Sequence, residues 1–160
     1  MDELILTEET RIKLNADFEK MNADFDRIEA GIEGMDSLKP SDFPVKHIFT
    51  PGLYIRVLFL PAGSLLTSNI HATEHPFTIS MGECTVWCPH NGTQLLRAPH
   101  TGITLPGTRR IIFCHTDVEW STYHANPTDC QDHEKIMREI LVQRVNPMLE
   151  PKEESHELVT

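Results

Sequence analysis

Metal-ligand side chains gather near the middle of this chain, where Asn69, His71, Glu74 and His75 lie within seven residues. Stretches rich in strand-forming residues flank this group on both sides. Neutral imidazole binds zinc, iron, nickel and manganese, and an amide or carboxylate oxygen can complete such a ligand set. The group therefore predicts a metal or substrate site carried by a β-scaffold, with Asn69, His71 and His75 facing the same interior.

Two residues farther along the chain are further candidates for this site. His124, at the end of the last strand-like stretch, is expected to supply a third nitrogen ligand. Trp120 is expected in the core or at the rim, with stacking on a ligand as the alternative. Glu74 stays a ligand-binding candidate, although strand alternation points it away from His75.

Two other metal motifs are weaker. The stretch from His71 to His75 matches H-x-x-E-H, but that motif needs a helix, and Pro76 disfavours helical geometry at the residue before it. Cys84 and Cys88 would lie about 13 Å apart on one strand, too far to share one zinc ion, so they are predicted to be buried thiols.

The elements that must position these residues are mostly strands. Short strand-like stretches alternate with turn signals such as Asn91-Gly92, which is typical of a β-hairpin. This pattern predicts an all-β barrel or sandwich over residues 45–126. The expected strands are His47–Phe49, Leu53–Leu60, Leu65–Ile70, Phe77–Met81, Cys84–Cys88, Thr93–Ala98, Gly102–Leu105, Arg110–His115 and Val118–His124.

A helix is expected before the barrel and another after it. Residues 1–44 comprise an amphipathic helix with Thr7 as N-cap, followed by a linker, and residues 127–148 a helix capped by Thr128 or Asp129. Residues 149–160 read as an acidic tail. The first helix either packs on its own barrel or self-associates, since its apolar residues form a heptad seam: Leu14, Phe18, Met21, Phe25, Ile28, Ile32 and Met35.

The composition of the chain limits the classes of partner that it is expected to bind. The 160 residues carry a formal net charge of −10, which argues against nucleic acid or an anionic membrane as the main partner. No apolar run is long enough to span a membrane. The N-terminus lacks the basic and apolar regions of a secretory signal, so we expect a cytoplasmic protein whose 4 cysteines are reduced.

With these motifs in place, residues 52–126 resemble the cupin superfamily. Gly63 to Gly82 is similar to the first cupin motif, with His75 where the family usually has glutamate, His71 at its second histidine and Asn69 at its first. Pro106-Gly107 resembles the second motif, and places Arg110 at its histidine. At that position the resemblance implies anion binding instead of metal binding, because a guanidinium repels a cation but holds a carboxylate or phosphate through two hydrogen bonds. The turns also look like those of small cupins predicted in bacteriophages, which implies host cytoplasm if the protein is phage-encoded.

The resemblance implies a mainly β double-stranded β-helix, or jelly roll, with a sheltered cavity. It implies a divalent metal (Zn, Fe, Ni or Mn) or a small anionic ligand, and as an enzyme a metal-dependent oxygenase or an isomerase. The alternative is a non-catalytic structural or partner-binding cupin that forms homo-oligomers through its N-terminal helix.

Overall fold

The computed structural model describes residues 8–33, 43–89, 91–144 and 146–149. One compact unit contains residues up to Gly31 together with the segment from Arg144 onward, and the other comprises Ile32–Gln143. In the described segments, neither helix combines the length and the hydropathy that a membrane crossing requires.

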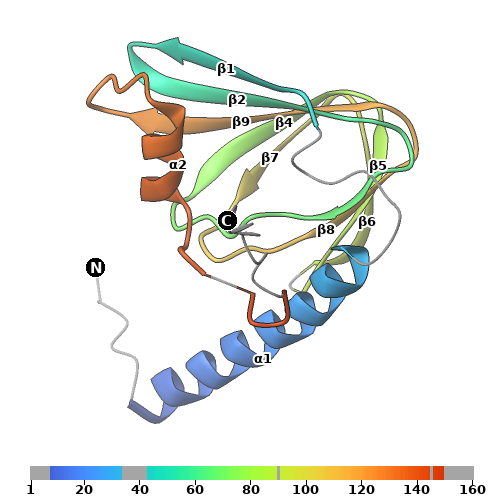
Figure 1. Cartoon of the computed structure of the whole chain (residues 1–160), viewed down its shortest axis with the longest axis vertical. Coiled ribbons are helices and arrows are strands. Elements are labelled where there is room, and N and C mark those ends of the chain that lie inside the picture. The colour runs from blue at the N-terminus through green and yellow to red at the C-terminus, as the bar shows by residue number, and fades with distance from the viewer. Residues whose placement is uncertain (1–7, 34–42, 90, 145, 150–160) are drawn as a thin grey trace, which may run out of the picture. The chain divides into compact units, whose positions relative to one another are not determined.

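The larger unit is a β-barrel made of two antiparallel sheets (Figure 1). Their strand orders are β1-β2-β9-β4-β7 and β3-β8-β5-β6. Strands β2 to β9 thus follow the order of an eight-stranded jelly roll, in which successive strands alternate between the two sheets except for β5 and β6, which form a hairpin within the smaller sheet. The strands of the described chain are β1 Val45–Thr50, β2 Gly52–Leu60, β3 Leu65–Thr67, β4 His75–Met81, β5 Glu83–Cys88, β6 Gly92–Arg97, β7 His100–Thr104, β8 Ile111–Cys114 and β9 Val118–Asn126.

The mainly β fold predicted from the sequence is confirmed, with one helix before the strands and one after them along the chain. Each predicted strand overlaps an observed one. The inward faces of both sheets meet in one apolar core, as the two-residue alternation requires. Its buried members are Phe43, Leu60, Leu66, Phe77, Ile79, Cys84, Val86, Ile112, Cys114, Val118 and Trp120. All four cysteines are free thiols, and Cys84 and Cys88 are buried as predicted.

The C-terminal helix α2, His133–Ile140, begins later than predicted. Asp132 is its N-cap and accepts hydrogen bonds from the backbone N–H of Glu134 and Lys135. The predicted caps Thr128 and Asp129 were wrong. Asp129 has a positive φ of 49° and accepts a hydrogen bond from Gly52 N, which ties the turn after β9 to the start of β2.

The smaller unit is built on helix α1, Glu8–Glu33. Arg144 Nη1 and Nη2 donate to the two carboxylate oxygens of Asp26 at 2.6 and 2.7 Å, and Asn146 donates to the Asp26 carbonyl and to Glu29. Along the predicted seam Phe25 is buried, whereas Phe18 and Ile28 are each 37% exposed. Thr7, Met35 and the side chain of Leu14 lie outside the described residues.

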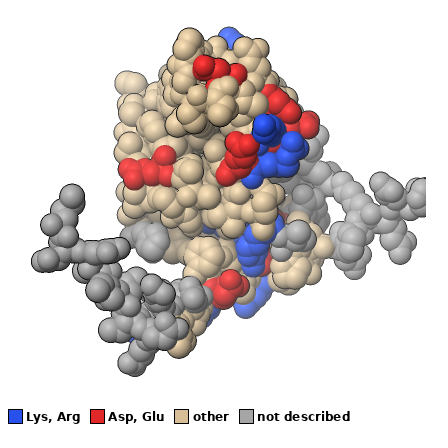
Figure 2. Space-filling model, turned by 90° about the vertical axis from the view of Figure 1, so that its left-hand side faces the viewer, with Lys and Arg blue, Asp and Glu red and all other residues tan. Residues whose placement is uncertain are grey.

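The surface carries charges of both signs. The face drawn in Figure 2 is mostly uncharged, and its Lys and Arg side chains lie beside Asp and Glu side chains. On the adjacent strands β6 and β5 of the barrel, Arg97 and Glu83 form an ion pair. Pairs of this kind are exposed to water, so they contribute little to stability.

Candidate functional site

Three histidines from separate segments meet inside one end of the barrel. His124 lies near the end of β9, and His75 is the first residue of β4. His71 belongs to no strand but forms an isolated bridge with Leu141, just after α2. Two hydrogen bonds fix its neighbours: Ala72 N donates to Ile140 O, and Val142 N donates to Ile70 O.

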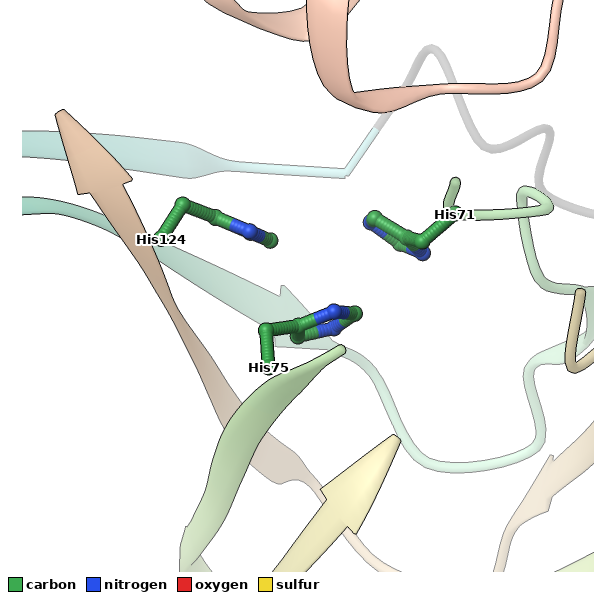
Figure 3. Close-up of side chains that lie close together, drawn as sticks. All are labelled: His71, His75 and His124. Carbon is green, nitrogen blue, oxygen red and sulfur yellow. The ribbon is translucent and has the colours of Figure 1, made fainter. Parts of the chain in front are cut away.

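The imidazole rings face one another (Figure 3). Ring centroids are 4.3 Å apart for His71 and His75, 4.5 Å for His75 and His124, and 5.5 Å for His71 and His124. One ring nitrogen from each lies within 4.8 Å of the other two. Nitrogens that share a tetrahedral zinc ion at about 2.0–2.1 Å lie about 3.4 Å apart, so small ring rotations would complete such a site.

Hydrogen bonds leave free nitrogens on two of these rings. His75 Nδ1–H donates to the carbonyl of Thr73 at 3.1 Å, which leaves the lone pair on Nε2. His124 Nε2 bonds the hydroxyl of Thr122 at 2.9 Å. Within the described chain, His124 Nδ1 is buried and has no hydrogen-bond partner. A buried polar atom without a partner is costly, and a metal ion would supply one.

Burial favours the neutral form of all three imidazole rings, because it lowers their pKa values. Desolvation, followed by the neighbouring histidines, lowers the pKa of His71 to about 3 and that of His124 to about 4. Desolvation and then Arg110 lower the pKa of His75, against the hydrogen bond to Thr73, which raises it. Neutral imidazole is the form that binds metal.

These lowered pKa values predict that the metal-free barrel loses stability between pH 6.5 and pH 5. In that window an unfolded histidine binds a proton while folded His124, with a pKa of about 4, does not. The free energy of unfolding therefore falls as the pH falls, by about 2 kcal/mol for His124 at pH 5. Urea unfolding in the presence of a chelator, followed by tryptophan fluorescence at both pH values, measures this loss.

The variant His124→Gln should show a weaker pH dependence by about the same amount. His115→Gln serves as the matched control, because His115 is exposed on the barrel surface. Equal pH dependence in the wild type and in His124→Gln would contradict a lowered pKa at His124.

Two arginines add positive charge to this end of the barrel. Arg110 is half-buried: its Nη1 donates to Thr104 Oγ1 at 3.1 Å, and its Cζ lies 5.2 Å from the centroid of the Phe77 ring. Arg56, on β2, is also half-buried. Its charge acts on His71 and His124, and that of Arg110 acts on His71 and His75.

Sequence reasoning missed Arg56, although a signal was present. Arg56 is the only charged residue in the apolar run from Leu53 to Leu60. Strand alternation points its side chain to the same face as those of Tyr54 and Leu60, which are both fully buried. Tyr54 was also missed; its hydroxyl bonds His47 Nδ1 at 2.7 Å, and its ring stacks on His124 with centroids 5.9 Å apart.

The structure does not bring the other candidates into this group. Asn69 is exposed, and β3 ends at Thr67, so strand alternation does not carry Asn69 onto the face of His71 as expected. Glu74 is exposed as well. Trp120 lies in the core and stacks on Phe77 with ring centroids 4.7 Å apart.

No protein-family model matches the chain, and no curated protein matches it. Solved structures are similar in fold. One is an RmlC-like cupin with a double-stranded β-helix fold from Methanocaldococcus jannaschii, with 15% identity and a TM-score of 0.44, covering 52% of this chain and 79% of that one. Another is a double-stranded β-helix protein from Klebsiella pneumoniae, with 14% identity and a TM-score of 0.47, covering 62% and 90%.

A third similar structure is a mutant of salicylate 1,2-dioxygenase from Pseudoaminobacter salicylatoxidans, with 13% identity and a TM-score of 0.49. That match covers 74% of this chain and 34% of the dioxygenase. The jelly-roll fold of the barrel is assigned from its own strand order.

Proposed function

We propose that this chain, which has the double-stranded β-helix fold of the cupins, binds one divalent metal ion through His71, His75 and His124. The observation that carries the proposal is the convergence of three imidazole nitrogens from three segments. The buried Nδ1 of His124, which has no hydrogen-bond partner within the described chain, supports the same assignment.

The donor set suits first-row metals. Three neutral nitrogens fit Zn, Fe, Ni or Mn and leave coordination positions for a ligand. A metal bound there would act as a Lewis acid that polarises or activates that ligand. Thr73 and Thr122 would hold the rings of His75 and His124 in orientation through their hydrogen bonds, as partners of metal-ligating histidines commonly do.

The ligand is proposed to be a small anion. Glu74 is exposed, and His75 occupies the position where cupins usually have glutamate, so no carboxylate from these residues balances the metal charge. Arg110 lies beside the histidines and is suited to hold a carboxylate through two hydrogen bonds. The anion would then lie between the metal ion and the guanidinium.

As an enzyme, such a protein would be a metal-dependent oxygenase rather than an isomerase that uses a histidine base. A general base at neutral pH needs a pKa near 7. The candidate bases are His71 and His75. Burial lowers the pKa of His71 to about 3 and also lowers that of His75, which makes both rings poor bases. Their neutral state suits metal binding instead.

Metal analysis of the purified 160-residue chain tests the proposal. We expect close to one metal ion per chain by elemental mass spectrometry after loading with Zn²⁺ and removal of excess. The loaded protein should also melt at a higher temperature than the chelator-treated protein, because a ligand that binds only the folded state stabilises it. A chain that retains no metal, with unchanged melting, would contradict the proposal.

A non-catalytic role through self-association is a second candidate. The half-exposed Phe18 and Ile28 on α1 favour it, because they lie on the heptad seam and would be covered in a coiled coil. Homo-oligomer formation, a phage origin and a cytoplasmic location stay predictions from the sequence.

A further inference from the structure

The two arginines next to the histidines lie on the inward face of the larger sheet or against it. On β2, Arg56 shares its face with buried Tyr54 and Leu60, because side chains two and four positions apart on a strand point the same way. Arg110 lies outside the strands, but its guanidinium covers the ring of Phe77, a buried residue of β4. Both cations therefore approach the interior of the barrel.

Strand register places them on two sides of the histidine group. His124 lies opposite Tyr54 of β2, and His75 lies opposite Thr104 of β7. In the next row along the sheet, Arg56 lies opposite Thr122, and Thr122 lies opposite Phe77. Arg56 therefore enters this row from β2, whereas the guanidinium of Arg110 lies over Phe77 of β4, on the other side of β9.

The distance between the two sides limits what can touch both arginines. Strands β2 and β4 are separated by β9, so their backbones lie about 10 Å apart at about 4.8 Å per step. Guanidinium groups that enter from strands this far apart can each pair with a separate anionic group. A molecule with two anionic groups a few bonds apart matches such a pair of arginines.

The charge of the site also calls for two negative groups. Within the described residues, neither Arg56 nor Arg110 forms an ion pair with a carboxylate; the ion pairs there join Asp24 to Arg27, Glu83 to Arg97 and Asp26 to Arg144. A divalent ion on three neutral imidazoles would add two more positive charges. Partly buried charges of one sign are costly unless opposite charges compensate them.

We propose that the site binds its metal ion together with a small dicarboxylate, whose two carboxylates pair with Arg56 and Arg110. This inference rests on the proposed metal site. Binding is linked: the dicarboxylate raises the affinity for metal, and the metal raises the affinity for dicarboxylate by the same factor. The arginines thereby determine which ligands enter, since a monoanion leaves one guanidinium unpaired.

Calorimetric titration of the 160-residue chain with Co²⁺ tests this linkage. Titrations are made in succinate and in acetate at equal ionic strength, and compared at equal free Co²⁺ concentrations. We expect succinate to raise the affinity for Co²⁺ by about tenfold or more relative to acetate. Titration with succinate, with and without bound Co²⁺, should give the same factor.

Arginine variants give effects of opposite sign in the two buffers. Arg56→Gln should bind Co²⁺ more tightly than the wild type in acetate, because a repelling charge is gone, and should lose the gain from succinate. Arg110→Gln should behave in the same way and serves as the second variant if Arg56→Gln does not fold. Arg97→Gln, at an exposed arginine of β6, is the matched control and should titrate like the wild type.

The outcomes separate the two proposals. Failure of Co²⁺ to bind in either buffer would overturn the metal site itself. Tight Co²⁺ binding with equal affinity in succinate and acetate would overturn the dicarboxylate and leave the metal site intact. An enhancement by succinate that survives in both Arg56→Gln and Arg110→Gln would overturn the role of the arginines.

Discussion

His124→Ala is expected to lower the affinity of the chain for Zn²⁺ by more than about 100-fold. Loss of an outer partner of a metal ligand typically costs about 10- to 100-fold, and His124 is proposed to be a ligand itself. Its Nδ1 is the buried nitrogen that lacks a hydrogen-bond partner within the described chain. Competition against a chromophoric chelator measures the affinity.

Glu74→Gln is the matched control for that experiment. Glu74 precedes His75 directly but is exposed, so its replacement should leave the Zn²⁺ affinity within about twofold of the wild type, as for a surface change. Circular dichroism of both variants verifies the barrel. A folded His124→Ala chain with wild-type affinity would exclude His124 as a ligand, and a large loss in Glu74→Gln would assign the carboxylate a role that its exposure argues against.

Gly82→Ala is expected to destabilise the barrel by about 2–5 kcal/mol. Gly82 has a φ of +92°, and a Cβ atom built there would lie 2.0 Å from the carbonyl oxygen of Asp117. Left-handed backbone costs an alanine about 1–2 kcal/mol, and forcing neighbouring backbone apart adds about 1–3 kcal/mol. Urea unfolding followed by tryptophan fluorescence gives the change in the free energy of unfolding.

Gly92→Ala separates these two contributions. Gly92 also has a positive φ, of +65°, but no atom lies within 4 Å of a Cβ built there. Its replacement should cost only the conformational part, about 1–2 kcal/mol. Equal losses in the two variants would show that the contact between Gly82 and Asp117 does not restrict that turn.

The barrel could be predicted from local patterns, because short stretches of strand-forming residues are separated by turn signals. The run from Leu53 to Leu60 is rich in strand-forming residues, and the observed β2 includes all of it. The start of α2 could not be predicted in this way. Asp129 was a plausible cap, but its side chain bonds Gly52, a residue 77 positions away whose proximity no local pattern reveals.

The candidate site was predicted in part for the same reason. His75 and His124 lie on strands, so the face to which each side chain points could be predicted from strand alternation. Asn69 was expected to face the same interior on the assumption that β3 continues past Thr67, but the strand ends there. Arg56 was overlooked because its neighbours are apolar, although its parity with Tyr54 points it inward.

The bridge between His71 and Leu141 means that two different parts of the chain hold the three imidazoles in place. Two of the three imidazoles are supplied by the jelly roll, whereas the third is held by the chain that leaves α2. A shortened protein that stops before α2 would retain all nine strands and yet lack the support that presents His71. Helix α2 therefore supports both the scaffold, because its Ile136 and Ile140 pack against Tyr54 of β2, and the site, because the segment directly after it pairs with His71.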